Sequence, residues 1–267
     1  MNNIETIFLG IVQGLTEFLP VSSSGHLVIF EKLIGLKEPE ILLDASLHLG
    51  TLIAVCIYFR NDLVNMVTEL WSFVLPGSKK QDVAGPNAHL ALMVVLGSVP
   101  TAIIGLLFKD SLEKAFGSLF LVGIMLMITG TIVGITRLIP KSHNTAMRVG
   151  PLIALAVGTV QGLAIMPGIS RSGSTIVCAL LLGLNRELAG RFSFLLAIPA
   201  IVGAVILQLD ADAIHRVGPL PLILGLVSSG IIGFLALKLL MGIVKKGLFY
   251  YFAPYCWGVG LLTLYFS

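Results

Sequence analysis

Residues 10–26 have the sequence GIVQGLTEFLPVSSSGH, and residues 158–174 repeat it, 148 positions later, as GTVQGLAIMPGISRSGS. The gapless alignment has eight identical positions, which in the first copy are Gly10, Val12, Gln13, Gly14, Leu15, Ser22, Ser24 and Gly25. Proline, glycine and serine interrupt both copies, so the helical pieces beside each break are shorter than the ~20 residues that a membrane crossing needs. Broken backbone at membrane depth is tolerated where it is buried in protein or lines a wet cavity. Each copy therefore predicts a re-entrant helix–loop–helix hairpin.

The composition of the chain identifies lipid as the solvent around these hairpins. Hydrophobic residues make up 56% of the 267 positions and charged residues only 12%, whereas a soluble domain carries about 25% charged residues. Helices satisfy their own backbone hydrogen bonds in lipid, and the long apolar runs do not alternate as barrel strands do. We predict an all-α integral membrane protein. The scattered basic residues form no stripe and argue against a nucleic-acid partner.

Three apolar segments follow each hairpin. They lie at about 42–59, 88–108 and 119–139 in the first half, and at about 191–209, 218–244 and 248–266 in the second. A re-entrant hairpin returns to its own side and three spans then reverse the chain, so the second half begins on the opposite face. The prediction is one polytopic membrane domain, residues 1–267, made of two inverted-topology repeats, about 1–147 and 148–267.

The basic residues between the predicted spans favour one orientation. Eleven fall on one face: Arg60, Lys79, Lys80, Arg137, Lys141, Arg148, Arg186, Arg191, Lys238, Lys245 and Lys246. Five fall on the other: Lys32, Lys37, Lys109, Lys114 and Arg216. Because cytoplasmic loops carry the excess of Lys and Arg, we expect the first face to be cytoplasmic. Both termini and the mouth of the first hairpin then lie on the outer side.

Three ionisable residues lie inside the repeated segments: Glu17, His26 and Arg171. Charged groups at membrane depth are costly and usually functional. A structural alternative is an ion pair between Glu17 and Arg171 that locks the two hairpins together. The surrounding polar residues favour function, because Gln13 shares a helix face with Glu17 and both breaks are rich in hydroxyls, namely Ser22, Ser23, Ser24, Ser170, Ser172, Ser174 and Thr175.

The two breaks have the features of a phosphate site. Each precedes a helix, so backbone N–H groups gather at a positive helix N-terminus beside Gly25 or Gly173. The guanidinium of Arg171 matches phosphate oxygens bidentately. A carboxylate and a histidine opposite it indicate either a metal ion, with Glu17 as ligand, or general acid–base chemistry.

The stretches QGLTEFLPVSSSGH (13–26) and PGISRSGST (167–175) resemble the undecaprenyl-diphosphate phosphatase family, the bacitracin-resistance proteins of bacterial membranes. Its (E/Q)xxxE motif is met by Gln13 and Glu17, its PVSSxGH motif by residues 20–26, and its PGxSRSG motif by residues 167–173. The resemblance covers essentially the whole chain, including FSFLLAIP at 192–199. Some members have Glu where this chain has Gln13, which implies weaker or differently arranged metal binding.

The resemblance implies hydrolysis of undecaprenyl diphosphate to the monophosphate at the outer, periplasmic face of the bacterial inner membrane. The product is the lipid carrier of peptidoglycan synthesis, and the activity confers bacitracin resistance. A divalent cation, Mg²⁺ or Ca²⁺, supports the family's activity. Carried over by position, the catalytic set is Glu17, His26 and Arg171, with Ser22 and Ser23 beside them. Substrate-binding candidates are Gln13, Ser22, Ser24, Gly25, Ser170, Ser172, Gly173, Ser174 and Thr175.

Several alternatives stay open at this point. The nucleophile is either Ser23, activated by His26 three residues later, or His26 itself, with a metal-bound water as third choice. Acid-phosphatase-like lipid phosphatases fit poorly, because Val177 stands where their motif needs histidine. Inverted repeats with broken helices are also typical of secondary transporters and lipid flippases.

Two further features lie outside the motifs. His48 falls within a predicted span, where a core histidine is favoured over one that lines a cavity. The Gly130-x-x-x-Gly134 pair allows close helix approach, either inside the molecule or between two copies in a homodimer.

Overall fold

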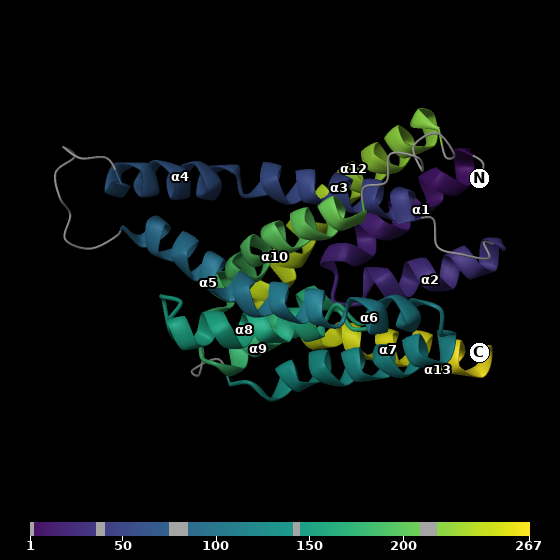
Figure 1. Cartoon of the computed structure of the whole chain (residues 1–267). Coiled ribbons are helices and arrows are strands. Elements are labelled where there is room, and N and C mark those ends of the chain that lie inside the picture. Colours follow the sequence, from purple (N-terminus) through teal and green to yellow (C-terminus); the bar gives the residue numbers. More distant parts are fainter. Residues whose placement is uncertain (1–2, 36–40, 75–84, 141–144, 209–217) are drawn as a thin grey trace.

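The computed structural model describes residues 3–35, 41–74, 85–140, 145–208 and 218–267. Every regular element in these ranges is a helix (Figure 1). The α-helices are α1 (Asn3–Phe18), α2 (Ser23–Ile34), α3 (Ile41–Tyr58), α4 (Arg60–Val74), α5 (Pro86–Leu107), α6 (Lys109–Phe116), α7 (Leu119–Gly134), α8 (Pro151–Leu163), α9 (Arg171–Leu181), α10 (Arg186–Gln208), α12 (Pro219–Lys246) and α13 (Ala253–Tyr265). Two 3₁₀ helices, η1 (Ile135–Leu138) and η3 (Phe249–Phe252), adjoin α7 and α13. The all-α prediction is confirmed. Lys37, Lys79, Lys80, Lys141 and Arg216, which entered the count of basic residues, lie outside the described residues.

Four of the predicted spans are single helices long and apolar enough to cross a membrane: α5, α7 with η1, α10 and α12. Helices α3 and α4 meet the same test together but bend by 72° between them. The segment predicted at 248–266 is helical but shorter, because η3 of four residues precedes an α13 of only 13. A chain with this many apolar helices is a multi-pass membrane protein.

Both repeated segments are broken where proline, glycine and serine predict it. The helices on either side, α1 and α2 in the first copy and α8 and α9 in the second, have 16, 12, 13 and 11 residues. In Figure 1, the α1–α2 hairpin enters from the end that holds both chain termini, and α8–α9 enters from the opposite end. The two breaks meet in the middle of the molecule. This is the arrangement that inverted repeats would produce, although the inverted topology itself stays a prediction.

The first helix of each hairpin packs against a span of the other half, α1 along α12 and α8 along α5. Glycines allow both contacts. A Cβ on Gly14 would lie 2.8 Å from the Ser229 carbonyl oxygen, and one on Gly158 would overlap the Gly97 carbonyl oxygen. Small residues of this kind let helix backbones approach closely in membranes. Each hairpin is therefore held against a helix of the other half that is long enough to cross the membrane.

The Gly130-x-x-x-Gly134 pair is used inside the molecule. A Cβ on Gly130 would lie 2.6 Å from the Trp257 ring, and one on Gly134 would touch Ala253, so both glycines accommodate α13. A homodimer therefore finds no support in this pair and stays a prediction.

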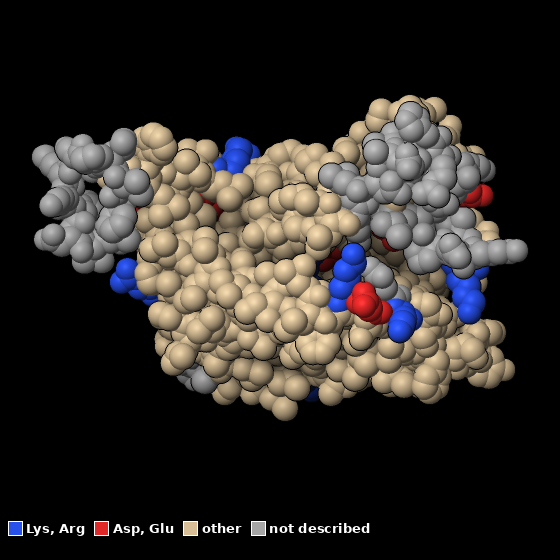
Figure 2. Space-filling view, in the orientation of Figure 1, with Lys and Arg blue, Asp and Glu red and all other residues tan. Residues whose placement is uncertain are grey.

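The outer surface is largely apolar. Figure 2 shows the charged side chains as isolated groups, one of them over α6, on an otherwise uncharged face. Large apolar side chains point outward from the spans, among them Val95, Ile103, Ile231 and Leu235, each at least half exposed. In water such a surface would aggregate. In a bilayer it meets acyl chains.

Candidate functional site

The same serine begins the second helix of each hairpin. Ser22 is the N-cap of α2 and accepts a hydrogen bond from the Gly25 amide (3.2 Å), and Ser170 is the N-cap of α9 and accepts one from the Gly173 amide (3.0 Å). N-cap serines satisfy amides that the helix leaves without partners. A second hydroxyl follows in each copy, with Oγ–Oγ distances of 3.3 Å for Ser22–Ser24 and Ser170–Ser172. The repeated serines and glycines therefore form the same helix cap in both hairpins.

Glycines let the two breaks touch. A Cβ on Gly25 would lie 3.0 Å from Gly168 Cα, and one on Gly173 would lie 3.2 Å from Pro20 Cβ. The Ser172 hydroxyl also donates to the Leu19 carbonyl at 3.4 Å. Gly25 and Gly173, predicted as substrate-binding positions, thus also bring the hairpin tips together.

A threonine on α7 fixes the second break from behind. The Thr129 hydroxyl donates to the Gly168 carbonyl at 2.8 Å and accepts from the Ser170 amide at 3.0 Å. Thr129 is fully buried, and Gly168 adopts a φ of 93° that favours glycine. Thr129 could not be predicted as a site residue, because a single threonine in an apolar span belongs to no motif.

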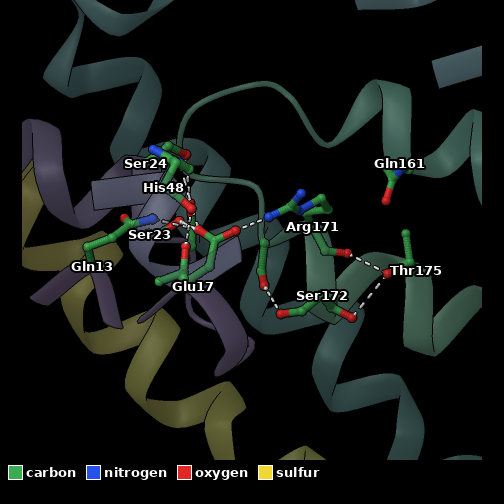
Figure 3. A network of polar contacts seen from close by, with 12 residues as sticks. Gln13, Glu17, Ser23, Ser24, His48, Gln161, Arg171, Ser172 and Thr175 are labelled. Atoms are coloured by element: carbon green, nitrogen blue, oxygen red, sulfur yellow. Dashed lines mark hydrogen bonds and ion pairs between the residues drawn. The ribbon is translucent and has the colours of Figure 1, made fainter. Parts of the chain in front are cut away.

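Glu17 lies at the centre of the site and joins the two hairpins (Figure 3). Its side chain is only 2% exposed and forms an ion pair with Arg171, whose Nη2 donates to Oε1. The other carboxylate oxygen, Oε2, accepts from Ser23 Oγ at 2.6 Å and from Gln13 Nε2 at 3.0 Å. The predicted grouping of these four residues is what the structure shows. Removal of either charged partner would leave an uncompensated buried charge.

The ion pair leaves Arg171 able to bind a phosphate. A guanidinium has five N–H donors in a fixed fork, and the contact with Glu17 uses the Nη2 group alone among the described residues. The Arg171 side chain keeps 22% of its surface exposed. The structural and functional interpretations of this pair are therefore compatible.

His26 does not reach back to Ser23, as the sequence interpretation required for a Ser23–His26 pair. Its Nδ1 lies 2.8 Å from the Ser22 carbonyl oxygen, which can only accept, so Nδ1 carries a proton. Its Nε2 lies 2.9 Å from the Tyr255 hydroxyl, and the two rings stack with centroids 5.7 Å apart. The reason is the helical repeat of α2. His26 follows Ser22 by four residues, which places the imidazole ring next to the Ser22 carbonyl oxygen. Tyr255 belongs to α13 and was not found from the sequence.

His48 lies closer to the site than the favoured interpretation of the sequence placed it. It was expected in the apolar core, but its Nε2 lies 3.8 Å from Glu17 Oε2, and Figure 3 shows it beside Gln13 and Ser23. Its Nδ1 lies 2.7 Å from the Asp44 carbonyl oxygen. Helix α3 therefore brings an imidazole to the Glu17 carboxylate.

The remaining hydroxyls of the second break are turned toward protein. Thr175 Oγ1 donates to the Arg171 carbonyl at 2.8 Å and also contacts the Ser193 hydroxyl of α10. Ser174 Oγ is buried without a hydrogen-bond partner among the described residues. Gln161, the counterpart of Gln13, donates to Thr101 Oγ1 and the Leu196 carbonyl, both at 3.2 Å. The second copy thus contributes Arg171 to the site, while most of its other polar groups hold the fold.

The donor set around Glu17 fits a cation that arrives with its ligand. No cluster of three or more His, Cys, Asp or Glu that could hold a metal occurs within the described part of the chain. Gln13 Oε1 is buried without a hydrogen-bond partner among the described residues, and the Glu17 carboxylate beside it already accepts from Arg171, Ser23 and Gln13. Mg²⁺ is commonly bound by one or two carboxylates plus substrate phosphates. Gln13 and Glu17 match that arrangement and not an all-protein cage.

Known proteins are similar to this chain along nearly its whole length. A family model described as bacitracin resistance protein BacA matches residues 6–262. The undecaprenyl-diphosphatase of Desulfosudis oleivorans is 48% identical over 273 residues, covering 99% of this chain and 98% of the relative. That of Desulfatibacillum aliphaticivorans is 46% identical over 271 residues with the same coverage, and that of the more distant Korarchaeum cryptofilum is 40% identical over 264 residues, 99% of either chain. The resemblance drawn from the two motifs is confirmed, and the chain belongs to the bacitracin resistance protein BacA family.

Proposed function

We propose that the protein hydrolyses undecaprenyl diphosphate to undecaprenyl phosphate and phosphate, and that this recycles the lipid carrier of cell-wall synthesis and confers bacitracin resistance. The observation that carries the proposal is the contact of Glu17 with both Ser23 and Arg171 at the meeting point of two broken helices. A nucleophile, a base and a phosphate-binding cation thus lie together at membrane depth. The relatives named undecaprenyl-diphosphatase support the substrate.

The diphosphate binds where the two hairpins meet, and the prenyl tail extends among lipid-facing spans. Arg171 holds the phosphate oxygens with the donors that Glu17 does not use. The first amides of α2 and α9 add the positive ends of two helices. Charge on the transferred phosphoryl group spreads over its oxygens in the transition state, so these fixed donors stabilise that state.

Ser23 attacks the terminal phosphorus, and Glu17 Oε2 accepts its proton. Their distance of 2.6 Å is a hydrogen bond ready for that transfer. The Ser23 Oγ–P bond forms, the bond from phosphorus to the bridging oxygen breaks, and undecaprenyl phosphate leaves. Water then hydrolyses the phosphoserine. His26 is a weaker candidate for the nucleophile, because Tyr255 holds its Nε2.

We propose that Mg²⁺ or Ca²⁺ enters with the diphosphate and is held by the Glu17 carboxylate and Gln13 Oε1. A bound cation would neutralise part of the diphosphate charge. Replacement of Gln13 by Glu adds a second carboxylate and should lower the cation concentration that gives half-maximal phosphate release. Gln13→Leu should raise it. If the wild type and both variants need the same cation concentration for half-maximal phosphate release, the cation binds elsewhere.

Phosphate release by the purified protein in detergent tests the activity itself. We expect inorganic phosphate from undecaprenyl diphosphate without any membrane gradient, and none from Glu17→Gln or Arg171→Ala prepared in parallel. Activity in these two variants would indicate a contaminating phosphatase. A transporter or flippase without hydrolytic activity would release no phosphate in any sample.

The site is proposed to face the outside of the bacterial inner membrane. The mouth of the α1–α2 hairpin lies at the end of the molecule that holds both chain termini. The basic residues Arg137, Arg148, Lys245 and Lys246 belong to the opposite end, which the positive-inside rule assigns to the cytoplasm.

A further inference from the structure

The backbone of Ser22 is strained. Its φ of 69° and ψ of 98° are unusual for a residue with a side chain, and in the described part of the chain no other residue except glycine has a positive φ. Such a conformation costs free energy and persists only where neighbouring groups hold it. Ser22 directly precedes Ser23, whose Oγ donates to Glu17 Oε2 at 2.6 Å. The backbone at Ser22 therefore decides where the proposed nucleophile points.

The second hairpin provides an internal comparison. Ser170, the counterpart of Ser22, begins its helix with an ordinary φ of −79° and ψ of 114°. Its carbonyl oxygen accepts from the Ser174 amide at 2.9 Å. In the first hairpin His26 occupies the position of Ser174, and the Ser22 carbonyl oxygen lies 3.2 Å from the His26 amide nitrogen and 2.8 Å from His26 Nδ1. The strain thus occurs in the copy whose serine carbonyl has a side-chain donor in addition to the amide.

Two consecutive residues of α13 hold this arrangement. His26 Nδ1 carries the proton, because the Ser22 carbonyl oxygen can only accept, so Nε2 accepts from the Tyr255 hydroxyl at 2.9 Å. The rings of His26 and Tyr255 also stack, with centroids 5.7 Å apart and planes inclined by 5°. The Cys256 thiol donates to the Pro20 carbonyl oxygen at 3.4 Å. Helix α13 therefore contacts the first break on both sides of Ser22.

Each break is thus held by the last apolar helix of the other half of the chain. Thr129 of α7 contacts the Gly168 carbonyl and the Ser170 amide of the second break, as α13 contacts the first. Within the described residues, only the contacts from α13 lead to a strained residue other than glycine. This difference assigns α13 a role at the residue that precedes the proposed nucleophile.

We infer that Tyr255 is a positioning residue that acts through His26. Its hydroxyl orients the imidazole, and the imidazole holds the Ser22 carbonyl oxygen. The strained backbone of Ser22 in turn aims the Ser23 hydroxyl at Glu17. Neither Tyr255 nor His26 takes part in making or breaking bonds, so His26 is neither nucleophile nor base. This role rests on the proposed phosphatase function.

The first test is Tyr255→Phe, which removes the hydroxyl and keeps the ring. We expect kcat for phosphate release to fall by about 10-fold, the effect of losing one buried hydrogen bond. KM should not change, because Arg171 and the helix N-termini still hold the diphosphate. The matched control is Tyr265→Phe on the same helix, where the tyrosine is 80% exposed, and its kcat should equal that of the wild type. If the Tyr255 hydroxyl only stabilises the fold, Tyr255→Phe will unfold at a lower temperature with kcat unchanged, and the inference is wrong.

The second test separates a holding role of His26 from a chemical one. Asparagine places an amide N–H donor near the position of Nδ1 and can neither attack phosphorus nor take a proton. We expect His26→Ala to lose about 10²-fold in kcat, as a misplaced nucleophile would. His26→Asn should keep at least about 10-fold more activity than His26→Ala, because it retains one hydrogen bond to the Ser22 carbonyl. Equal losses in the two variants would give the imidazole a chemical role and overturn the inference.

A double variant tests the link between the two side chains. Tyr255→Phe should add nothing to His26→Asn, because the Nε2 that accepts from the hydroxyl is already gone. Independent losses that multiply would show that Tyr255 does not act through His26. Absence of phosphate release from the wild-type protein would instead overturn the proposed function.

Discussion

At the scale of single residues, two histidines lie at the site in different surroundings. His26 lies in the motif but is turned to Ser22 and Tyr255, whereas His48 lies outside the motif and faces Glu17. Ser23 therefore donates to a carboxylate and not to the histidine three residues later. This contact supports the proposal that Ser23 is the nucleophile.

Labelled substrate tests that role. We expect Ser23→Ala to lose at least 10²–10⁴-fold in kcat, as much as His26→Ala or more. Rapid quench of the wild type should trap a phosphoryl label that survives acid, because phosphoserine is stable there and phosphohistidine is not. An acid-labile label, lost in His26→Ala, would move the nucleophile to His26. No label under any quench would leave a water molecule as the attacking group.

The Arg171 guanidinium is predicted to need its planar fork as well as its charge. Arg171→Lys should lose more than ~2 kcal/mol of transition-state stabilisation, because charge-assisted hydrogen bonds contribute about 1.5–3 kcal/mol each. In kcat/KM this corresponds to a loss of about 30-fold or more. Arg148→Lys, at an exposed arginine outside the site, should change nothing. Near-normal turnover of Arg171→Lys would contradict the phosphate-binding role and leave Arg171 only its structural ion pair with Glu17.

At the scale of elements, the breaks and the glycine contacts decide where the hairpins sit. The Pro–Ser–Gly composition predicted both breaks, and the N-caps Ser22 and Ser170 explain how each chain resumes its helix. The bend of 72° between α3 and α4 was not predicted. The polar residues Arg60, Asn61 and Asp62 mark the end of the apolar run at Phe59, but no proline or glycine there indicates a change of helix direction.

The contact of α8 with α5 is testable by one methyl group. In Gly158→Ala the new Cβ would overlap the Gly97 carbonyl oxygen, so α8 must shift. We expect a loss of about 1–3 kcal/mol in stability, typical of overpacking, and lower phosphatase activity because α8 leads to the Arg171 break. Thermal unfolding in detergent measures the first effect. Gly203→Ala on α10 is the matched control, since nothing lies within 4 Å of its Cβ position. It should be neutral or slightly stabilising, and equal behaviour of the two variants would contradict the packing argument.

At the scale of the whole molecule, the distribution of charge predicts how the protein lies in the membrane. Met147 belongs to the end rich in basic residues and is 81% exposed, whereas Ser267 is the exposed last residue at the other end. In a chain whose Cys56, Cys178 and Cys256 are replaced by alanine, we introduce Met147→Cys or Ser267→Cys. A membrane-impermeant maleimide should label Ser267→Cys in intact spheroplasts and Met147→Cys only after permeabilisation. The reverse pattern would place the α1–α2 mouth in the cytoplasm.

The sequence by itself determined the solvent, the helical class, the breaks in the repeated segments and the identity of Gln13, Glu17, Ser23 and Arg171 as neighbours. These conclusions follow from local patterns, because a polar residue in an apolar run is costly and must find partners at the same depth. The two gapless motifs also indicated the family, which the comparisons confirm.

Only the tertiary structure decided the partners of the two histidines. The contacts of His26 with Tyr255, and of Thr129 with Gly168, join α2 to α13 and α7 to the second break, between residues far apart in the sequence. His48 reaches Glu17 because α3 packs against α1 in one particular rotation. Nearly uniform apolar helices do not encode that rotation in their periodicity. It is set by which small residues, such as Gly50 against Ser229, let two backbones approach, and that depends on both helices at once.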